Sequence, residues 1–333
     1  MDKRKTMRSR PLLLWEILNS ETNAERALTT KELLAELEKR GAPCERRALE
    51  RDIDALIGMN YPIRKERGLS YRYYLDGRSF DRGEISILLD CVQASAFLTE
   101  DLTWKLMLKI AALGGGGKEE IDERAGNILL NSVNKTTNAE VKESVSVIEQ
   151  AVIGQKKISF RYFDMDQEGG RVYRKNGELY VASPLNKTIK DGFYYLLAKT
   201  DNHENLSIYR IDRMSGTALL DEPFDPLEQF SDPSALEQYK KQMFGMYGGK
   251  EVRVKLRVHR TLLNMVCDTF DLTETRLTAE SADYYTFTCS VIDSPMFIAW
   301  CCSYGEKLQV VAPQSYVQKV AQYVQTLSGM YPG

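Results

Sequence analysis

The stretch DGFYYLLAKT, residues 191–200, decides how the middle of this chain folds. The run from Phe193 to Leu197 is entirely apolar or aromatic, which is typical of a buried strand. The turn dipeptide Asp191-Gly192 precedes it and marks where the strand begins. We therefore predict a strand here, with Phe193, Tyr194 and Leu197 in the core. Whether the stretch is only core or the centre of a site depends on its neighbours.

Short segments rich in Val, Ile, Tyr and Phe lie on both sides of this strand, separated by turn residues. Regular spacing of such segments predicts a small, strongly curved all-β domain of the barrel type. A short helix is expected just before them. The segments are SVSVIEQAVIGQ (144–155, the helix), ISFRYFDMD (158–166), RVYRKNGELYVASPLN (171–186) and LSIYRIDRMSGTALLDEPF (206–224).

Four blocks of this region together resemble the WYL domain, which is named for a Trp-Tyr-Leu tripeptide. The blocks are Ile158–Tyr162, Tyr180–Leu185, Tyr194–Leu196 and Tyr209–Met214. The resemblance covers about residues 139–225, and the tail WCCSYGEKLQVVAPQSYVQKVAQYVQTL (300–327) resembles the extension that commonly follows this domain. The WYL resemblance implies an Sm-like β-barrel that senses a nucleic-acid or nucleotide-like anion and adjusts DNA binding by the N-terminal domain.

The resemblance also implies roles for single residues. Ser183 would line the pocket as a small hydrogen-bonding group, and Tyr195 would offer a ring for stacking and a hydroxyl. Arg210 and Arg213 would bind phosphate. Related sequences often carry His where this chain has Ile208, and this departure removes one polar contact.

The residues by themselves leave a structural alternative open. Strand alternation places Tyr209 on one face and Arg210 with Asp212 on the other. Arg213 could simply pair with Asp212 or another carboxylate, so both arginines could be structural. Arg161 and Tyr162 fit either a ligand site or the core.

The first eighty residues predict three helices. The first runs from Pro11 to Asn19, and the second begins at a capping box formed by Thr29 and Glu32. The third spans ERRALERDIDALIGM (45–59). Its cap position is Cys44, where Ser or Thr is the better cap, so the exact start of this helix is open.

The third helix has two distinct faces. Leu49, Ile53 and Leu56 form one buried stripe, and Arg47 and Arg51 project from the opposite face, one turn apart. Such a helix is suited to enter a major groove of DNA. The alternative is a solvated charged face, because four carboxylates interleave with the arginines: Glu45, Glu50, Asp52 and Asp54.

The next segment, Tyr61–Leu75, predicts a hairpin around Gly68. Three helices and a basic hairpin make a winged helix-turn-helix, and the sequence resembles the N-terminal domain of bacterial regulators of the deoxyribose-repressor type. We expect the recognition helix and the hairpin, which also carries Arg72, to contact DNA. The candidate DNA-binding residues are Arg46, Arg47, Arg51, Arg64, Lys65 and Arg67.

Composition narrows the function classes. Residues 1–80 carry 17 Lys/Arg and 13 Asp/Glu, and the rest 28 and 34, which gives +4 and −6. A basic start joined to an acidic body indicates a polyanion partner at one end. The tetraglycine Gly114–Gly117 lacks the flanking residues of a phosphate loop. Two histidines and no nucleophile motif argue against an enzyme and predict neither a metal nor another cofactor.

The sequence as a whole predicts a multidomain α+β protein: a winged helix-turn-helix (1–80), a helical linker (81–138), the WYL barrel (139–225) and an α/β C-terminal extension (226–333). We expect a cytoplasmic, homodimeric transcription regulator that binds double-stranded DNA and responds to an anionic ligand. Scattered, reduced cysteines and the lack of a membrane-spanning run favour that location. The alternatives are an accessory nucleic-acid-binding protein that modulates another effector, and a scaffold.

Overall fold

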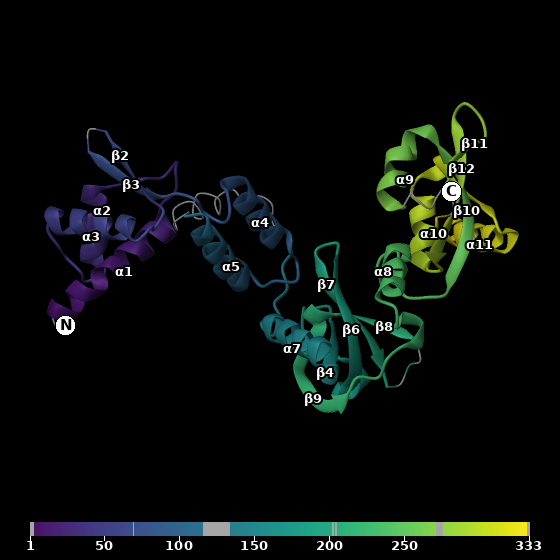
Figure 1. The fold of residues 1–333 in the computed structure, drawn as a ribbon. Coiled ribbons are helices and arrows are strands. Elements are labelled where there is room, and N and C mark those ends of the chain that lie inside the picture. The colour runs from purple at the N-terminus through teal and green to yellow at the C-terminus, as the bar shows by residue number, and fades with distance from the viewer. Residues whose placement is uncertain are drawn as a thin grey trace. The chain divides into compact units, whose positions relative to one another are not determined.

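The computed structural model describes residues 3–68, 70–115, 134–201, 203, 205–270 and 276–331. The chain divides into two compact units, Met1–Ala139 and Glu140–Gly333, and each is described by itself (Figure 1). Helices and short sheets occur in both, which confirms the multidomain α+β fold.

The N-terminal unit begins with a winged-helix-like arrangement of three helices and a small antiparallel sheet of order β1-β3-β2. Its core is formed by apolar residues of all three helices and of the hairpin, with Leu33, Leu49, Ile53 and Tyr73 fully buried. The elements are α1 (Lys3–Glu21), β1 (Leu28–Thr29), α2 (Thr30–Lys39), α3 (Arg46–Gly58), β2 (Ile63–Arg67), β3 (Tyr71–Leu75), α4 (Arg82–Ala94) and α5 (Glu100–Leu113).

Local signals set most of these boundaries. The capping box of Thr29 and Glu32 is present at the start of α2, and Asp81 caps α4 in the same way. The first helix starts earlier than expected, because Pro11 lies inside α1 rather than at its beginning. Lys, Arg and Met before Pro11 are good helix formers and continue the helix despite the proline.

Helices α4 and α5, which were expected in a linker, belong to the same compact unit as the winged helix. The Arg78 guanidinium donates hydrogen bonds to the carbonyls of Leu18 and Leu113, at 3.1 Å each. Gly115 closes α5 with φ +77°, and a Cβ there would lie 2.0 Å from the Thr22 carbonyl oxygen. The described part of the tetraglycine is therefore packed, while Gly116 and Gly117 lie outside the described residues.

The second unit begins with a helix and a curved sheet, which we call the half-barrel (residues 141–223). Strand β4 pairs with β5, β6 and β9, and the sheet continues from β6 through β7 to β8. No ladder joins β8 to β9 among the described residues, so the barrel-type sheet stays open. The elements are α7 (Val141–Gly154), β4 (Lys156–Met165), β5 (Arg171–Tyr173), β6 (Tyr180–Lys190), β7 (Phe193–Thr200), β8 (Leu206–Arg210) and β9 (Met214–Pro223).

Asp191 and Gly192 form the two-residue loop between β6 and β7. Their φ angles of 51° and 76° suit a tight hairpin, in which Lys190 pairs with Phe193. Leu196, Leu197 and Ala198 of β7 are fully buried. The placement of Phe193 in the core was wrong: its ring is half-buried and lies under a guanidinium described below.

Aromatic rings and the helix α7 fill the half-barrel. Phe160 is fully buried and stacks on Tyr180 at 5.5 Å between ring centroids, while Tyr209 meets it edge-on at 5.2 Å. Ile148 and Ala151 of α7 belong to the same buried cluster, and the helix lies against the strands (Figure 1). This packing fixes the strands that carry the candidate ligand residues.

The C-terminal part has a sheet of order β11-β12-β10-β13 covered by helices. Helices and strands alternate here, as expected for an α/β extension, and β10 carries the alternating sequence EVRVKLRV. The elements are α8 (Pro233–Gln242), β10 (Glu251–His259), α9 (Leu263–Thr269), β11 (Thr278–Ala279), β12 (Tyr284–Ile292), α10 (Pro295–Cys302), β13 (Leu308–Ala312) and α11 (Gln314–Met330).

All six cysteines are free thiols. Burial raises the pKa of Cys289 and of Cys301 to about 12, so both stay protonated at neutral pH. Within the described ranges, none of the helices has the length and apolar character required to cross a membrane.

Candidate nucleic-acid interface and anion site

Helix α3 is the first element of the candidate interface. It buries Leu49, Ile53 and Leu56, as the spacing predicts, and it leaves Arg47 and Arg51 exposed. Its N-cap is Glu45, which makes no side-chain cap hydrogen bond. The assignment of the cap to Cys44 was therefore wrong by one residue. The half-buried Cys44 thiol instead packs against the core of the unit.

The carboxylates around α3 are engaged with particular cations. Glu50 pairs with Arg46 at 2.9 Å, Asp52 pairs with Arg10 at 2.5 Å, and Asp54 lies 3.5 Å from Lys65. None of these three pairs includes Arg47 or Arg51, and neither arginine has an ion-pair partner among the described residues. The Arg51 Nε donates only to the Arg47 carbonyl, at 3.3 Å.

The hairpin contributes the second group of cations. Arg64 pairs with Asp76 at 2.7 Å, and the Lys65 ammonium lies 4.7 Å from the centroid of the Tyr71 ring. Arg67 is exposed near the tip of the hairpin and has no ion-pair partner within the described ranges. Of the candidate residues, Arg47, Arg51 and Arg67 thus have the charge most available to a polyanion.

In the half-barrel, two of the candidate ligand residues are direct neighbours. Tyr195 of β7 lies opposite Arg210 of β8 in the antiparallel register. The Arg210 guanidinium lies 3.5 Å from the centroid of the Phe193 ring and donates two hydrogen bonds to Asp212, at 3.0 and 2.7 Å. The backbone N–H of Arg210 donates to the Tyr162 hydroxyl at 3.1 Å.

Arg213 lies close to a second carboxylate. Its Nη1 is 3.4 Å from Asp164 Oδ1, and Asp164 accepts two further hydrogen bonds from Arg174, at 2.7 and 2.9 Å. The sequence left open that both arginines pair with carboxylates. In this structure they do: Arg210 pairs with Asp212, and Arg213 pairs with Asp164.

Ser183 is placed differently from the other three candidates. It has no solvent exposure, and its Oγ accepts a hydrogen bond from the Asp225 backbone N–H at 2.9 Å. The hydroxyl thus holds the chain that follows β9 against β6. The structure brings Tyr195 and Arg210 together but gives Ser183 an interior contact.

Comparisons with known proteins identify the parts of the second unit. The sequence matches the WYL domain over residues 143–219 and the WCX domain over residues 250–328. The chain contains a WYL domain and a WCX domain. A winged-helix-like unit precedes these two domains in the chain.

Several solved structures, among them the following two, are distantly similar, and no curated protein matches the sequence. Proteasome accessory factor B/C (PafBC) of Arthrobacter aurescens is 15% identical with a TM-score of 0.29, over 98% of this chain and 49% of that chain. A CRISPR Cas-related protein is 12% identical with a TM-score of 0.34, over 98% and 85%. The chain thus spans about half the length of the PafBC chain, and scores this low support no functional argument.

Burial and charge set the ionisation of the WYL domain residues. Burial raises the pKa of Tyr195 and of Tyr162, so both phenols stay neutral and can donate a hydrogen bond at neutral pH. The hydrogen bond from Arg174 lowers the pKa of Asp164, which therefore remains ionised. An anion that approaches Arg213 must compete with this carboxylate.

Sequence reasoning missed two cations of the WYL domain. The Arg174 guanidinium lies 5.1 Å from the Tyr162 ring centroid, and the Lys175 ammonium 4.3 Å from that of Tyr180. The turn Arg174–Gly177 holds them there, with Lys175 and Asn176 at φ 49° and 53°. The Asn-Gly pair was a visible turn signal, but nothing in the sequence placed this turn beside the aromatic cluster.

The described residues hold no group of three His, Cys, Asp or Glu side chains placed to bind a metal ion. The interface and the anion site are instead built from arginine, lysine and tyrosine. Such side chains bind phosphate and stack on bases, which is the chemistry of nucleic-acid recognition.

Proposed function

We propose that this protein is a DNA-binding transcription regulator whose WYL domain senses a nucleic-acid or nucleotide-like anion. The observation that carries the proposal is the geometry of α3. The helix is anchored by Leu49, Ile53 and Leu56, and it presents Arg47 and Arg51 as exposed side chains that form no ion pair within the described residues. A regulator of this kind acts on chromosomal DNA, so we expect it in the cytoplasm.

Double-stranded DNA is the partner that fits this face. A helix of 13 residues with outward arginines fits a major groove, where arginine pairs with guanine edges or phosphates. Arg46, Arg64, Lys65 and Arg67 would add contacts to the backbone from the start of α3 and from the hairpin.

Duplex binding over a range of salt concentrations tests this function. Fluorescence anisotropy with a labelled duplex from the region upstream of the gene should show an affinity that falls linearly with salt on logarithmic axes, because Lys and Arg release counterions from DNA. Absence of duplex binding at low salt, with and without added nucleotides, would contradict the function.

We further propose that Tyr195, Arg210 and Arg213 contact the anion in the WYL domain, with Ser183 supporting the strand behind them. The neutral phenol would donate to the ligand or stack on a base, and the arginines would exchange Asp212 and Asp164 for phosphate oxygens. The two carboxylates would then act as internal competitors that keep the site closed to weak anions.

Asp164→Asn is expected to tighten binding of a single-stranded oligonucleotide about two- to fivefold, because it removes the competing charge from Arg213 at a partly buried pair. The measurement is anisotropy with labelled oligothymidine, in an Arg47→Ala/Arg51→Ala background that weakens the N-terminal unit. Asp221→Asn is the matched control, since Asp221 pairs with Lys156 on the same domain. Equal or weaker binding by Asp164→Asn would count against the competition.

We propose a homodimer, because two winged helices related by a two-fold axis fit pseudo-palindromic DNA sites. Sedimentation equilibrium at micromolar concentration should give twice the chain mass of 38.0 kDa. A mass of one chain across that range would overturn the dimer.

A further inference from the structure

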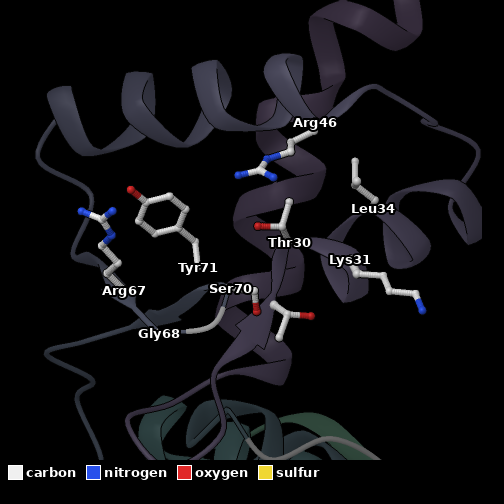
Figure 2. Close-up of a pocket in the computed structure, with 9 residues that line it drawn as sticks. Thr30, Lys31, Leu34, Arg46, Arg67, Gly68, Ser70 and Tyr71 are labelled. Carbon is white, nitrogen blue, oxygen red and sulfur yellow. The ribbon is translucent and has the colours of Figure 1, made fainter.

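A pocket of about 660 Å³ opens beside the recognition helix, and we call it the wing pocket (Figure 2). It is open to solvent and large enough for a nucleotide-sized ligand. Three elements meet around it. Its lining includes Thr30 and Lys31 of α2, Arg46 of α3, and Arg67, Ser70 and Tyr71 of the hairpin.

The N-terminus of α2 lines this pocket through Thr29, Thr30 and Lys31. The capping box uses the Thr29 hydroxyl for the N–H of Glu32, at 3.3 Å. Thr30 and Lys31 are the first two residues of the helix, whose N–H groups have no partner within an α-helix. Such a ten-residue helix end attracts anions through these donors and through its dipole.

The Thr30 side chain supplies an independent sign of a missing partner. Thr30 is 9% exposed, and its Oγ1 is buried without a hydrogen-bond partner. In Figure 2 its hydroxyl is directed toward the side on which Ser70 and Tyr71 lie. A buried hydroxyl without a partner is unfavourable, and a ligand oxygen in the pocket would satisfy it.

The charges around the wing pocket favour an anion. Lys31 and Arg67 have no ion-pair partner among the described residues, and the exposed Arg46 pairs with the half-buried Glu50 at 2.9 Å. The nearest opposing carboxylate at the helix start, Glu32, is occupied by the N–H and hydroxyl of Thr29, at 2.7 and 2.8 Å. The lining thus holds three cationic residues and three hydroxyl-bearing residues besides Thr29, but no carboxylate. In Figure 2 the Arg46 guanidinium is directed toward Tyr71, whereas the Lys31 ammonium extends away from it.

We propose that the wing pocket binds one phosphate group, held by the N–H groups at the start of α2, the Thr30 hydroxyl and the ammonium of Lys31. The exposed Lys31 side chain extends away from Tyr71 in Figure 2 and turns toward the phosphate on binding. The phosphate is either a phosphodiester of the DNA backbone or that of a free phosphate ester. The assignment to DNA rests on the proposed function, because the pocket shares α3 and the hairpin with the proposed interface. The assignment to phosphate stands without it.

Inorganic phosphate is the first probe, titrated into the full-length ¹⁵N-labelled protein against chloride at constant ionic strength. The amides of Thr30, Lys31 and Ser70 should shift together and saturate. Thr30→Val and Lys31→Gln should each weaken this binding at least about tenfold, since each removes a charge-assisted hydrogen bond. Lys39→Gln, at the other end of α2, is the matched charge control and should bind as the unmodified protein does.

Thr30→Val also has a stability readout that separates a ligand site from a structural role. Because the hydroxyl lacks a partner, its loss should leave the melting temperature in chloride unchanged or higher, while the stabilisation by phosphate disappears. A lower melting temperature of Thr30→Val in chloride would overturn the phosphate site. So would an equal rise of the melting temperature on adding phosphate in the unmodified protein, Thr30→Val, Lys31→Gln and Lys39→Gln.

Duplex DNA distinguishes the two sources of phosphate. If the backbone occupies the pocket, Lys31→Gln lowers the salt slope of duplex binding by about one relative to Lys39→Gln, whatever the sequence. If duplex binding is unchanged while phosphate still shifts Thr30, the source is a free phosphate ester. Phosphate binding in a protein that binds no duplex would reject the proposed function and retain the site.

Discussion

Replacing Arg47 and Arg51 together with alanine is expected to weaken duplex binding about 100-fold or more. Each arginine that pairs with a guanine edge contributes about 1–3 kcal/mol, and each that neutralises a phosphate adds about 0.9 to the salt slope. Both side chains are exposed and neither pairs with a carboxylate within the described residues, so the substitution removes charge without disturbing the core of the unit.

Arg253→Ala is the control for this effect. Arg253 is exposed on β10 in the WCX domain, so its loss removes one positive charge, half the change in the double variant, from the other compact unit. Anisotropy at several salt concentrations should show a large loss and a shallower slope only for the double variant. Equal duplex affinities for the double variant and the control would show that Arg47 and Arg51 of α3 do not contact DNA. The hairpin would then be the remaining candidate for DNA contact.

Phe160→Ala is expected to lower the free energy of unfolding of the WYL domain by about 3–5 kcal/mol. Phe160 is fully buried, and its ring lies 5.5 Å from Tyr180 and 5.2 Å from Tyr209 between centroids. Its removal leaves a cavity that the β-strands around it cannot close, because β4 is held by ladders to β5, β6 and β9.

Urea denaturation followed by circular dichroism measures this change. Tyr331→Ala is the control, because Tyr331 is 82% exposed and its loss should change stability by less than about 0.5 kcal/mol. Phe160→Leu should fall between the two, since it keeps most of the apolar volume. A loss below about 1 kcal/mol in Phe160→Ala would show that the aromatic cluster does not hold the half-barrel together.

Local patterns were enough to predict the elements that carry both candidate sites. The i, i+4, i+7 spacing of Leu49, Ile53 and Leu56 defined the buried face of α3, and the turn dipeptide Asp191-Gly192 defined the start of β7. Periodicity and turn chemistry act within a few residues of the chain, so they can be read without knowing what packs on them.

Charge partners could not be predicted in this way. From the sequence, Arg213 could pair with Asp212 or with another carboxylate. In the structure, Arg213 pairs with Asp164 of β4, and Asp212 pairs with Arg210. The carboxylates of α3 likewise find partners in α1 and in the hairpin. These choices depend on which strands and helices become neighbours, and no local rule contains that information.

The sequence by itself determined the class of the fold, the WYL resemblance and the two distinct faces of α3, because each rests on the order and spacing of residues along the chain. Only the tertiary structure decided that Ser183 faces the interior, that Phe193 lies beneath Arg210, and that the Thr30 hydroxyl is buried without a hydrogen-bond partner. Burial and hydrogen bonding are properties of the space around a side chain, and that space is formed by residues far away in the sequence.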